Sequence, residues 1–365
     1  MEKKKLGISV YCKKASFDQI IEYLKLARSY NFEILFISFV HLLKTDYFKN
    51  IDVIKKAKEL NYYVIADFDQ TSLNNLTKSN DLKIIKEIGI DCIRFDQQID
   101  AQSLANLTYN PYDIDVQLNI SNSFNFLDNV LDFKPILTRL SGSHNFYLLK
   151  DSALDIDFFN KTTDKFIRKN LNTSAFISSQ IANITLADNY TKAVSLEFFR
   201  NIDIISQAKY LFYSNKINNV IIANMFASKK ELEQLSLLNK DHLTLKINNL
   251  QKISKTEKEI LLWNNHFRRS DINTSYIRST FSRTIWNSFD IKPNNIKQVF
   301  NKGDIVILNN NANRYKGELH IILKDNYIDN NNLYNYIASV HSDELYLLDF
   351  IDSNSHFKYH CSIFK

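Results

Sequence analysis

The segment Leu6-Gly-Ile-Ser-Val-Tyr-Cys12 is a short apolar run with the composition of a buried strand. After it, apolar residues recur at the helical period through 17–30, and Ile34-Leu-Phe-Ile-Ser-Phe39 is a second strand-like run. A strand, a helix and a strand at this spacing predict a βαβ unit, in which the two strands lie parallel in one sheet.

The same alternation continues to about residue 240. We predict further strands at Tyr62–Phe68, Cys92–Asp96, Val116–Ser121, Leu140–Tyr147, Thr173–Ser178 and Asn219–Asn224, and helices at 123–132, 156–169, 197–213 and 229–239. Eight strand–helix units in about 240 residues have the size of a TIM (β/α)8 barrel. A doubly wound open α/β sheet is the structural alternative.

Beyond residue 240 the pattern changes to one helix, at 254–264, and several β-type runs separated by Asn-rich turns. The runs expected to form strands are Asp304–Leu308, Gly317–Leu323, Asn335–Val340 and Leu345–Ile351. We therefore predict a TIM-barrel catalytic domain at 1–240 and a smaller, mostly antiparallel β domain at 241–365.

Composition excludes several classes of protein. The 365 residues include only five glycines, and neither G-x-G-x-x-G nor G-x-x-x-x-G-K occurs, which excludes a standard Rossmann dehydrogenase and a P-loop NTPase. The net charge of +6 is spread among acidic residues, so we expect no nucleic-acid partner. No apolar run is long enough to span a membrane, and we expect no membrane association.

The three cysteines, Cys12, Cys92 and Cys361, are far apart and odd in number, which argues against a disulfide framework. The apolar run after the basic N-terminus is too short for a signal-peptide core, so we expect a cytoplasmic protein. The pattern His356-x-x-x-His360-Cys361 resembles half of a zinc site, but no paired cysteines complete it. We expect no metal and no organic cofactor.

Substrate sites in TIM barrels lie at the C-terminal ends of the strands. In this sequence those ends carry carboxylates, amides and a cation, the groups that bind a sugar or a phosphosugar. The candidates are Ser9, Tyr11, Asp67, Arg94, Asp96, Asn119, His144, Asn145, Glu197 and Asn224.

Each candidate also has a structural interpretation. Arg94 and Asp96 lie on the same side of their strand and could form an ion pair at the rim, and Asp67 could cap the next helix. His144 beside Asn145 could be a hydrogen-bonded pair in the core, and Glu197 suits the first turn of a helix.

These rim segments resemble the MupG family of bacterial 6-phospho-N-acetylmuramidases, in order along nearly the whole chain. The similar segments include Leu6-Gly-Ile-Ser-Val-Tyr11, Ile88-Gly-Ile-Asp-Cys-Ile-Arg-Phe-Asp96, Leu118-Asn-Ile-Ser121, His144-Asn-Phe-Tyr147, Leu196-Glu197 with Arg200, Val220-Ile-Ile-Ala-Asn-Met-Phe-Ala-Ser228, His266-Phe-Arg-Arg-Ser-Asp271, Ile277-Arg-Ser279 and Arg314-Tyr-Lys-Gly-Glu-Leu319. The resemblance implies a TIM barrel followed by a cyclophilin-like β domain.

It also implies hydrolysis of the β-1,4 bond between 6-phospho-N-acetylmuramic acid and N-acetylglucosamine, a cytoplasmic step in reusing peptidoglycan fragments. This sequence departs from the family at the rim: Asp69-Gln-Thr71 stands where the family has Pro-Arg, and Ala223-Asn224 stands where it has Gly-Asp. A second hypothesis is therefore a paralogue that binds a phosphosugar without hydrolysing it. A third is an enzyme that acts on another 6-phosphoglycoside.

Most glycosidases use two carboxyl groups. For such an enzyme we predict Asp96 and Glu197 as the pair, with Asp67 in reserve. Which is acid and which is base stays open, as do the stereochemistry and the formation of homo-oligomers. The expected partner is a small phosphosugar, whose hydroxyl and acetamido groups would be bound by Asn119, His144, Asn145 and Tyr11. Arg314 and its neighbour Tyr315, from the smaller domain, are the candidates for its phosphate or lactyl carboxylate.

Overall fold

The computed structural model describes residues 3–40, 42–43, 46–77, 81–96, 99–121 and 125–360. Cys361, one of the residues of the half zinc motif, lies outside the described residues. The chain divides into two compact units, Met1–Leu238 and Asn239–Lys365. Each unit has its own sheet and its own core, and each is described by itself below.

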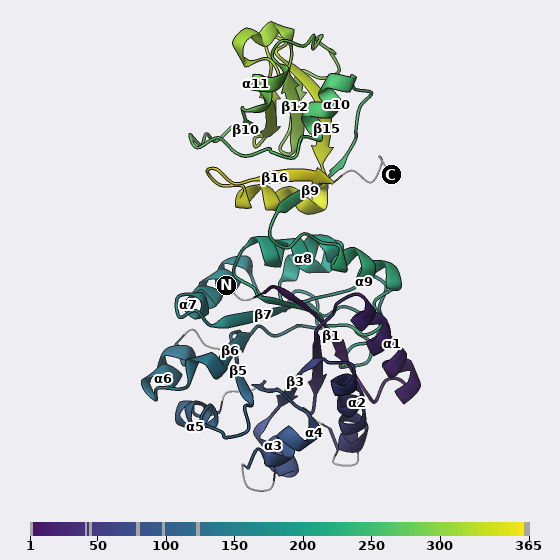
Figure 1. Cartoon of the computed structure of the whole chain (residues 1–365), viewed down its shortest axis with the longest axis vertical. Coiled ribbons are helices and arrows are strands. Elements are labelled where there is room, and N and C mark those ends of the chain that lie inside the picture. Colours follow the sequence, from purple (N-terminus) through teal and green to yellow (C-terminus); the bar gives the residue numbers. More distant parts are fainter. Residues whose placement is uncertain are drawn as a thin grey trace. The chain divides into compact units, whose positions relative to one another are not determined.

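The first unit, drawn from purple to teal in Figure 1, is a closed barrel of eight parallel strands. The strands are β1 (Lys5–Val10), β2 (Ile34–Ser38), β3 (Tyr63–Phe68), β4 (Cys92–Phe95), β5 (Asp115–Asn119), β6 (Leu140–Ser143), β7 (Asn172–Ile177) and β8 (Asn219–Ile222). β1 pairs with β2 on one side and with β8 on the other. This closure confirms the TIM barrel and excludes the open sheet.

Helices follow the strands along the chain. They are α1 (Phe17–Ser29), α2 (Tyr47–Glu59), α3 (Gln70–Thr77), α4 (Lys83–Ile88), α5 (Ala101–Leu107), α6 (Phe126–Asp132), α7 (Ile156–Ile167), α8 (Ile204–Tyr213) and α9 (Lys229–Ser236), with short 3-10 turns η2 (Leu137–Arg139) and η3 (Glu197–Asn201). The helix predicted at 197–213 is thus wrong in extent. It is divided between η3 and α8, because Asp203 has an extended backbone and its carboxylate caps α8 by accepting from Ile205 and Ser206.

Apolar side chains from several strands pack together inside the barrel. Phe36 of β2 and Phe176 of β7 pack edge to face with ring centroids 5.0 Å apart. Ile34, Ile65, Cys92, Ala193, Ile221 and Ala223 complete this buried cluster, which we call the barrel plug. Gly7 of β1 lies where a Cβ atom would come within 2.8 Å of Cβ of Ile34, so close packing of the strands explains why the position has no side chain.

The second unit is built on a six-stranded sheet in the order β10-β13-β12-β15-β9-β16, beside a two-stranded pair, β11 and β14. The strands are β9 (Leu243–Asn248), β10 (Tyr276–Ser279), β11 (Val299–Phe300), β12 (Asp304–Leu308), β13 (Leu319–Ile322), β14 (Tyr327–Ile328), β15 (Tyr334–Val340) and β16 (Phe357–His360). Every pairing is antiparallel except that of β16 with β9. The prediction of a separate, mostly antiparallel β domain is therefore confirmed.

The second unit also has helices α10 (Lys255–Leu261) and α11 (Ser282–Trp286) and 3-10 segments η4 (Asn310–Tyr315) and η5 (Ser342–Phe350). The strand predicted at Leu345–Ile351 is wrong, because these residues belong almost entirely to η5. The side chain of His341 caps this segment by accepting from the N–H of Asp343, and Leu347 and Leu348 are buried. A short apolar run fits a buried strand and a buried helical turn equally well, which explains the error.

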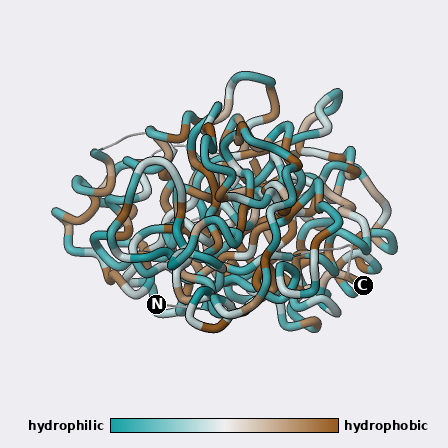
Figure 2. The backbone as a smooth tube through the Cα atoms, turned by 90° about the horizontal axis from the view of Figure 1, so that it is seen from above, coloured by the Kyte–Doolittle hydropathy of each residue, from teal (hydrophilic) through white to brown (hydrophobic). Residues whose placement is uncertain are grey.

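Along the backbone in Figure 2, short hydrophobic stretches alternate with hydrophilic ones, as expected for strands and helices that each pack on a core. Among the described residues, no helix has both the length and the apolar character needed to cross a bilayer.

Candidate active site

The ends of β3 and β4 place two carboxylates on one guanidinium. Asp67 and Arg94 are directly paired in the register of these neighbouring strands, and Asp96 follows Arg94 by two residues. Nη1 of Arg94 lies 2.5 Å from Oδ1 of Asp67 and 3.6 Å from Oδ1 of Asp96. The interpretation of Arg94 and Asp96 as a rim ion pair is thus correct, and Asp67 is its third member.

The three side chains differ in exposure. Arg94 is 2% exposed and Asp67 9%, whereas 37% of the Asp96 side chain is open to solvent. Burial raises the pKa of Asp67 to about 6, although the neighbouring Arg94 acts to lower it. The site therefore holds one buried carboxyl that takes up a proton near neutral pH, beside a more exposed carboxylate.

Amide side chains fix the arginine and the end of β4. Nη2 of Arg94 donates to Oδ1 of Asn145, and Nδ2 of Asn119 donates to the carbonyl oxygen of Asp96 at 2.8 Å. Nε of Arg94 is buried without a hydrogen-bond partner among the described residues. Asn119 and Asn145 thus belong to the same cluster as the two carboxylates.

His144 belongs to the buried core and not to this cluster of charged side chains. It is fully buried and stacks on Phe159, with ring centroids 4.0 Å apart. Nε2 lies 2.8 Å from the hydroxyl of Thr163, and Nδ1 lies 3.3 Å from the hydroxyl of Ser121, which in turn accepts from the N–H of Asn145. Burial lowers the pKa of His144 to about 3, so the ring is neutral.

The end of β1 is also buried. The hydroxyl of Tyr11 donates to the carbonyl oxygen of Ala223 at 2.5 Å, and burial raises the pKa of Tyr11 above its usual value. The hydroxyl of Ser9 is buried without a hydrogen-bond partner among the described residues. Both side chains lie within the folded barrel, 5% and 1% exposed.

Asp69, and not Asp67, binds the first turn of α3. Oδ1 of Asp69 accepts from the N–H of Ser72 at 2.6 Å. The suggestion that Asp67 caps the next helix is therefore wrong, because its carboxylate binds Arg94 instead.

Glu197 is held in a clamp of its own. Its two carboxylate oxygens accept from the N–H groups of Asp151 and Ala153 at 3.0 and 2.9 Å, and Nε of Arg200 donates to Oε1 at 2.6 Å. Burial opposes ionisation of Glu197, but the hydrogen bonds, that of Arg200 first, hold its pKa below the usual value. Glu197 does lie in the first turn of a helical segment, as its sequence position suggested.

A pocket of about 740 Å³ adjoins Glu197. It is lined mainly by two loops, at 148–156 after β6 and at 189–192 before Glu197. Both loops follow barrel strands, so they belong to the C-terminal end of the barrel, where TIM-barrel sites are found. Lys150 and Lys192 add positive charge to the lining.

Arg200 appears in the sequence analysis only beside Glu197, without a role of its own. Besides binding Glu197, it donates to the carbonyl oxygens of Tyr147, Leu148 and Leu149. The same loop contains Asn145, the partner of Arg94. Arg200 therefore ties the Glu197 clamp to the loop that contacts the carboxylate cluster. Its spacing of three residues from Glu197 was the available signal.

Asn224 is fully buried. Its Nδ2 donates to the carbonyl oxygens of Ser179, Ala182 and Thr191, and its Oδ1 accepts from the N–H of Ser179. Asn224 thus anchors both ends of the long loop that leads to the pocket.

Arg314 and Tyr315 lie in η4 of the second unit. The Arg314 side chain is exposed, and its Nη2 donates to the Tyr315 hydroxyl at 2.5 Å. Within the described residues, no group of three or more His, Cys, Asp or Glu side chains is arranged to hold a metal ion.

Two family models match this chain. The family model described as 6-phospho-N-acetylmuramidase, N-terminal, matches residues 6–237, and the model described as 6-phospho-N-acetylmuramidase, C-terminal, matches residues 243–360. A comparison with curated proteins found no match.

Two crystal structures are similar over the full length. An uncharacterized B. cereus protein is 33% identical with a TM-score of 0.90, over 98% of this chain and 100% of that chain. A conserved Enterococcus faecalis protein of unknown function shares the fold at 20% identity and a TM-score of 0.71, over 98% of this chain and 97% of that chain. Because the two family models together span almost all of the chain, the protein belongs to the 6-phospho-N-acetylmuramidase (MupG) family.

Proposed function

We propose that this protein is a glycosidase that cleaves the β-1,4 bond between 6-phospho-N-acetylmuramic acid and N-acetylglucosamine, or a closely related 6-phosphoglycoside. In a cell this reaction would serve the cytoplasmic reuse of peptidoglycan fragments. The family membership supports this substrate class. The observation that carries the proposal is the placement of two carboxyl groups, Asp67 and Asp96, on the single guanidinium of Arg94 at the C-terminal end of the barrel.

The two carboxyls have surroundings that suit different roles. Glycosidases pair a protonated carboxyl, which donates to the leaving oxygen, with an ionised one on the sugar. We assign the proton donor to Asp67, whose pKa of about 6 keeps part of it protonated near neutral pH. Asp96, the more exposed of the two and 3.6 Å from Arg94, is the second carboxyl of the pair.

The distances support a retaining mechanism. Since Nη1 of Arg94 lies 2.5 Å from Asp67 and 3.6 Å from Asp96, the two contacting carboxylate oxygens are at most about 6 Å apart. Retaining glycosidases have carboxyls about 5–5.5 Å apart, and inverting ones need roughly 6.5–9.5 Å to admit a water molecule. The upper bound of about 6 Å lies below the inverting range, and on this basis we propose that the product keeps the β configuration.

The remaining candidates have supporting roles in this proposal. Asn145 orients Arg94, and Asn119 orients the end of β4. Both amides would bind sugar hydroxyls. His144, Tyr11, Ser9 and Asn224, which are buried, hold the strands and loops that shape the site. Glu197 and Arg200 form one wall of the pocket. We keep Arg314 and Tyr315 as the candidates for the phosphate.

The test is incubation of the purified protein with 6-phospho-N-acetylmuramyl-β-1,4-N-acetylglucosamine, followed by mass spectrometry. We expect release of both monosaccharides, and proton NMR at early times should show the β anomer of the phosphosugar. Asp67→Asn and Asp96→Asn should each lower kcat about 100-fold or more, the usual loss for a missing acid or base. Glu197→Gln should lower it far less.

The matched control is Asp203→Asn, which also removes one carboxylate from the barrel but leaves a good helix cap on α8. It should retain parental activity. An intact disaccharide at high concentrations of the parent protein would reject the reaction. Full activity in both Asp67→Asn and Asp96→Asn would reject the assigned site.

The second candidate function is phosphosugar binding without hydrolysis. It is favoured by Glu197, whose two carboxylate oxygens are already occupied by Arg200 and two backbone N–H groups. Titration of the disaccharide by calorimetry separates the two functions, because binding without any released monosaccharide is expected only for the second.

A further inference from the structure

A second cluster of charged side chains lies in the second unit. Three arginines surround the ring of Tyr315: Arg278 from β10, Arg283 from α11, and Arg314 beside it in η4. Their guanidinium carbons lie 5.4, 5.7 and 4.7 Å from the ring centroid. Guanidinium groups at these distances are attracted to the ring face, which holds them in place.

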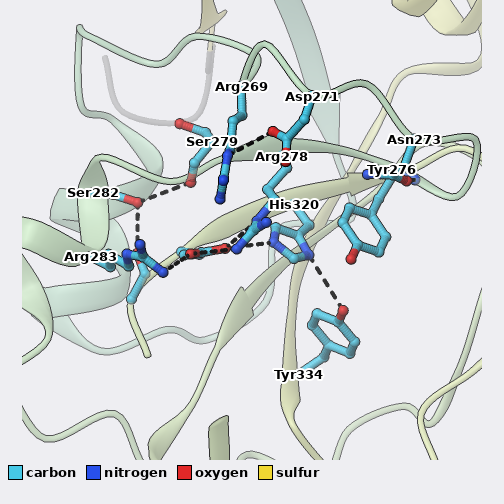
Figure 3. A network of polar contacts seen from close by, with 12 residues as sticks. Arg269, Asp271, Asn273, Tyr276, Arg278, Ser279, Ser282, Arg283, His320 and Tyr334 are labelled. Atoms are coloured by element: carbon cyan, nitrogen blue, oxygen red, sulfur yellow. Dashed lines mark hydrogen bonds and ion pairs between the residues drawn. The ribbon is translucent and has the colours of Figure 1, made fainter. Parts of the chain in front are cut away.

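Arg278 and Arg283 share one buried carboxylate. Glu318 is fully buried, and its oxygens accept from Nε and Nη2 of Arg278 at 2.8 and 3.1 Å and from Nη1 of Arg283 at 2.7 Å. Figure 3 shows Arg283 approaching this contact from one side, and Arg278 and His320 from the other. Nε2 of His320 lies 3.2 Å from the same carboxylate.

The charges do not balance. His320 is buried under the stacked ring of Tyr276, 4.3 Å between centroids, and burial lowers its pKa, so it adds no charge at neutral pH. The cluster therefore has three positive guanidinium groups and one negative carboxylate, a surplus of two positive charges. Arg269, also drawn in Figure 3, has its own partner in Asp271 at 2.7 Å and does not enter this count.

Donors remain available. Glu318 takes two of the N–H groups of Arg278 and one of Arg283, Tyr315 accepts one from Arg314, and the described residues offer no acceptor for the other N–H groups. Arg283 is 31% exposed and Arg314 is exposed, so these N–H groups can be reached from solvent. Several arginine forks fixed at one place are the arrangement that matches the oxygens of a phosphate.

The backbone that presents the cluster is unusual. Asn313, directly before Arg314, has φ 52° and ψ −117°, a conformation rarely taken by a residue with a side chain. Gly317 has φ +84°, and a Cβ atom there would lie 3.4 Å from Cα of Arg283. Its carbonyl oxygen accepts from the hydroxyl of Ser282, which ties α11 to the start of β13. The arginines are thus held together before any ligand arrives.

We propose that Arg278, Arg283 and Arg314, gathered around Tyr315, form an oxyanion site that binds the phosphate group of a phosphate monoester, with Glu318 as the fixed counter-ion of Arg278 and Arg283. The site itself rests on the second unit alone. That the monoester is a sugar 6-phosphate rests on the proposed function.

The experiment is calorimetric titration of the full chain with N-acetylglucosamine 6-phosphate, and with N-acetylglucosamine as the ligand that lacks only the phosphate. We expect binding of the first alone, with inorganic phosphate as a competitor. Arg283→Gln and Arg314→Gln should each weaken binding about tenfold or more, since each removes charge-assisted hydrogen bonds. Both variants leave Arg278 on Glu318, which protects the fold, and circular dichroism should confirm that they are folded.

Arg269→Gln is the matched control, because it removes an exposed arginine of the same unit that is paired elsewhere. It should bind like the parent protein. Unchanged affinity in both Arg283→Gln and Arg314→Gln would overturn the site. N-acetylmuramic acid, which has a carboxylate and no phosphate, tests the ligand class: if it binds as tightly as the phosphosugar, the assignment to phosphate is wrong.

Failure of this inference is separate from failure of the proposed function. Calorimetry measures binding of N-acetylglucosamine 6-phosphate and mass spectrometry measures hydrolysis of the disaccharide, so the two results are independent. If the parent protein binds the phosphosugar through these arginines but never cleaves the disaccharide, the oxyanion site stands and the glycosidase is rejected.

Discussion

His144 is a titratable side chain that belongs to the buried core of the barrel. Its ring lies between the hydroxyls of Thr163 and Ser121 and against Phe159, and burial lowers its pKa to about 3. The unfolded chain binds a proton on this histidine below about pH 6.5, whereas the folded protein does not until far lower pH. Stability from this group is therefore present above about pH 6.5 and is lost as the pH falls.

We predict that His144→Gln weakens the acid sensitivity of the barrel. The parent should lose about 1.4 kcal/mol per pH unit from this histidine between about pH 6.5 and 3. The raised pKa of Asp67 acts in the opposite direction between about pH 4 and 6, so the informative quantity is the difference between variant and parent. Urea unfolding followed by circular dichroism at pH 7 and pH 5 measures it.

The exposed His242 supplies a matched substitution, His242→Gln, which removes an imidazole from the surface instead of from the core. A variant His144→Gln that loses as much stability as the parent between the two pH values would contradict the assignment.

Asp67, Arg94 and Asp96 were predictable as neighbours because strand ends of a parallel barrel meet at one rim. The surroundings of Glu197 were not, because its partners Asp151 and Ala153 lie on a loop more than forty residues earlier. Residue type and strand position indicate which groups gather, but the partner of each oxygen depends on loop conformation. Asp67 therefore moved from reserve to the centre of the proposed site.

Among the elements, α8 depends on the capping residue directly before it, Asp203. Asp203 accepts from the N–H groups of Ile205 and Ser206 and separates α8 from η3. Asp203→Ala should lower the free energy of unfolding by about 1 kcal/mol, within a usual range of 0.5–2, because two N–H groups lose their acceptor. Chemical denaturation checks this value. Asp203→Asn, which keeps a capping oxygen, should stay close to the parent, and equal losses in both variants would contradict the capping role.

The length and the apolar pattern of each strand explain which strands could be predicted from the sequence. β9 has a clear alternating pattern, with Leu243, Leu245 and Ile247 buried, yet it was missed because it directly follows the predicted domain boundary. β10 and β16 are four residues each, too short to show a period. The barrel strands were easier, because parallel strands covered on both faces appear as continuous apolar runs.

At the level of the whole molecule, each unit has a separate core, and both tryptophans, Trp263 and Trp286, belong to the second. Gly7→Ala should destabilise the barrel by about 1–3 kcal/mol, because the new methyl group would overlap Ile34. The barrel transition seen by circular dichroism should move to lower temperature, while the transition seen by tryptophan fluorescence should not.

Gly303→Ala is the reciprocal control. A Cβ atom there would overlap Leu345 in the second unit, so this variant should move the tryptophan signal instead. If either variant shifts both signals equally, the two units unfold as one and the prediction fails.

The barrel plug has a consequence for the order of events in a catalytic cycle. Because Phe36, Phe176 and Ile221 pack together inside the barrel, a sugar bound near Asp96 must enter and leave through the same end of the barrel. For the proposed reaction, a lingering product then occupies the space that the next disaccharide needs. Both sugars released in one turnover must leave through that end before the next disaccharide can bind. The packing of the barrel interior therefore imposes an order in which product release precedes substrate binding.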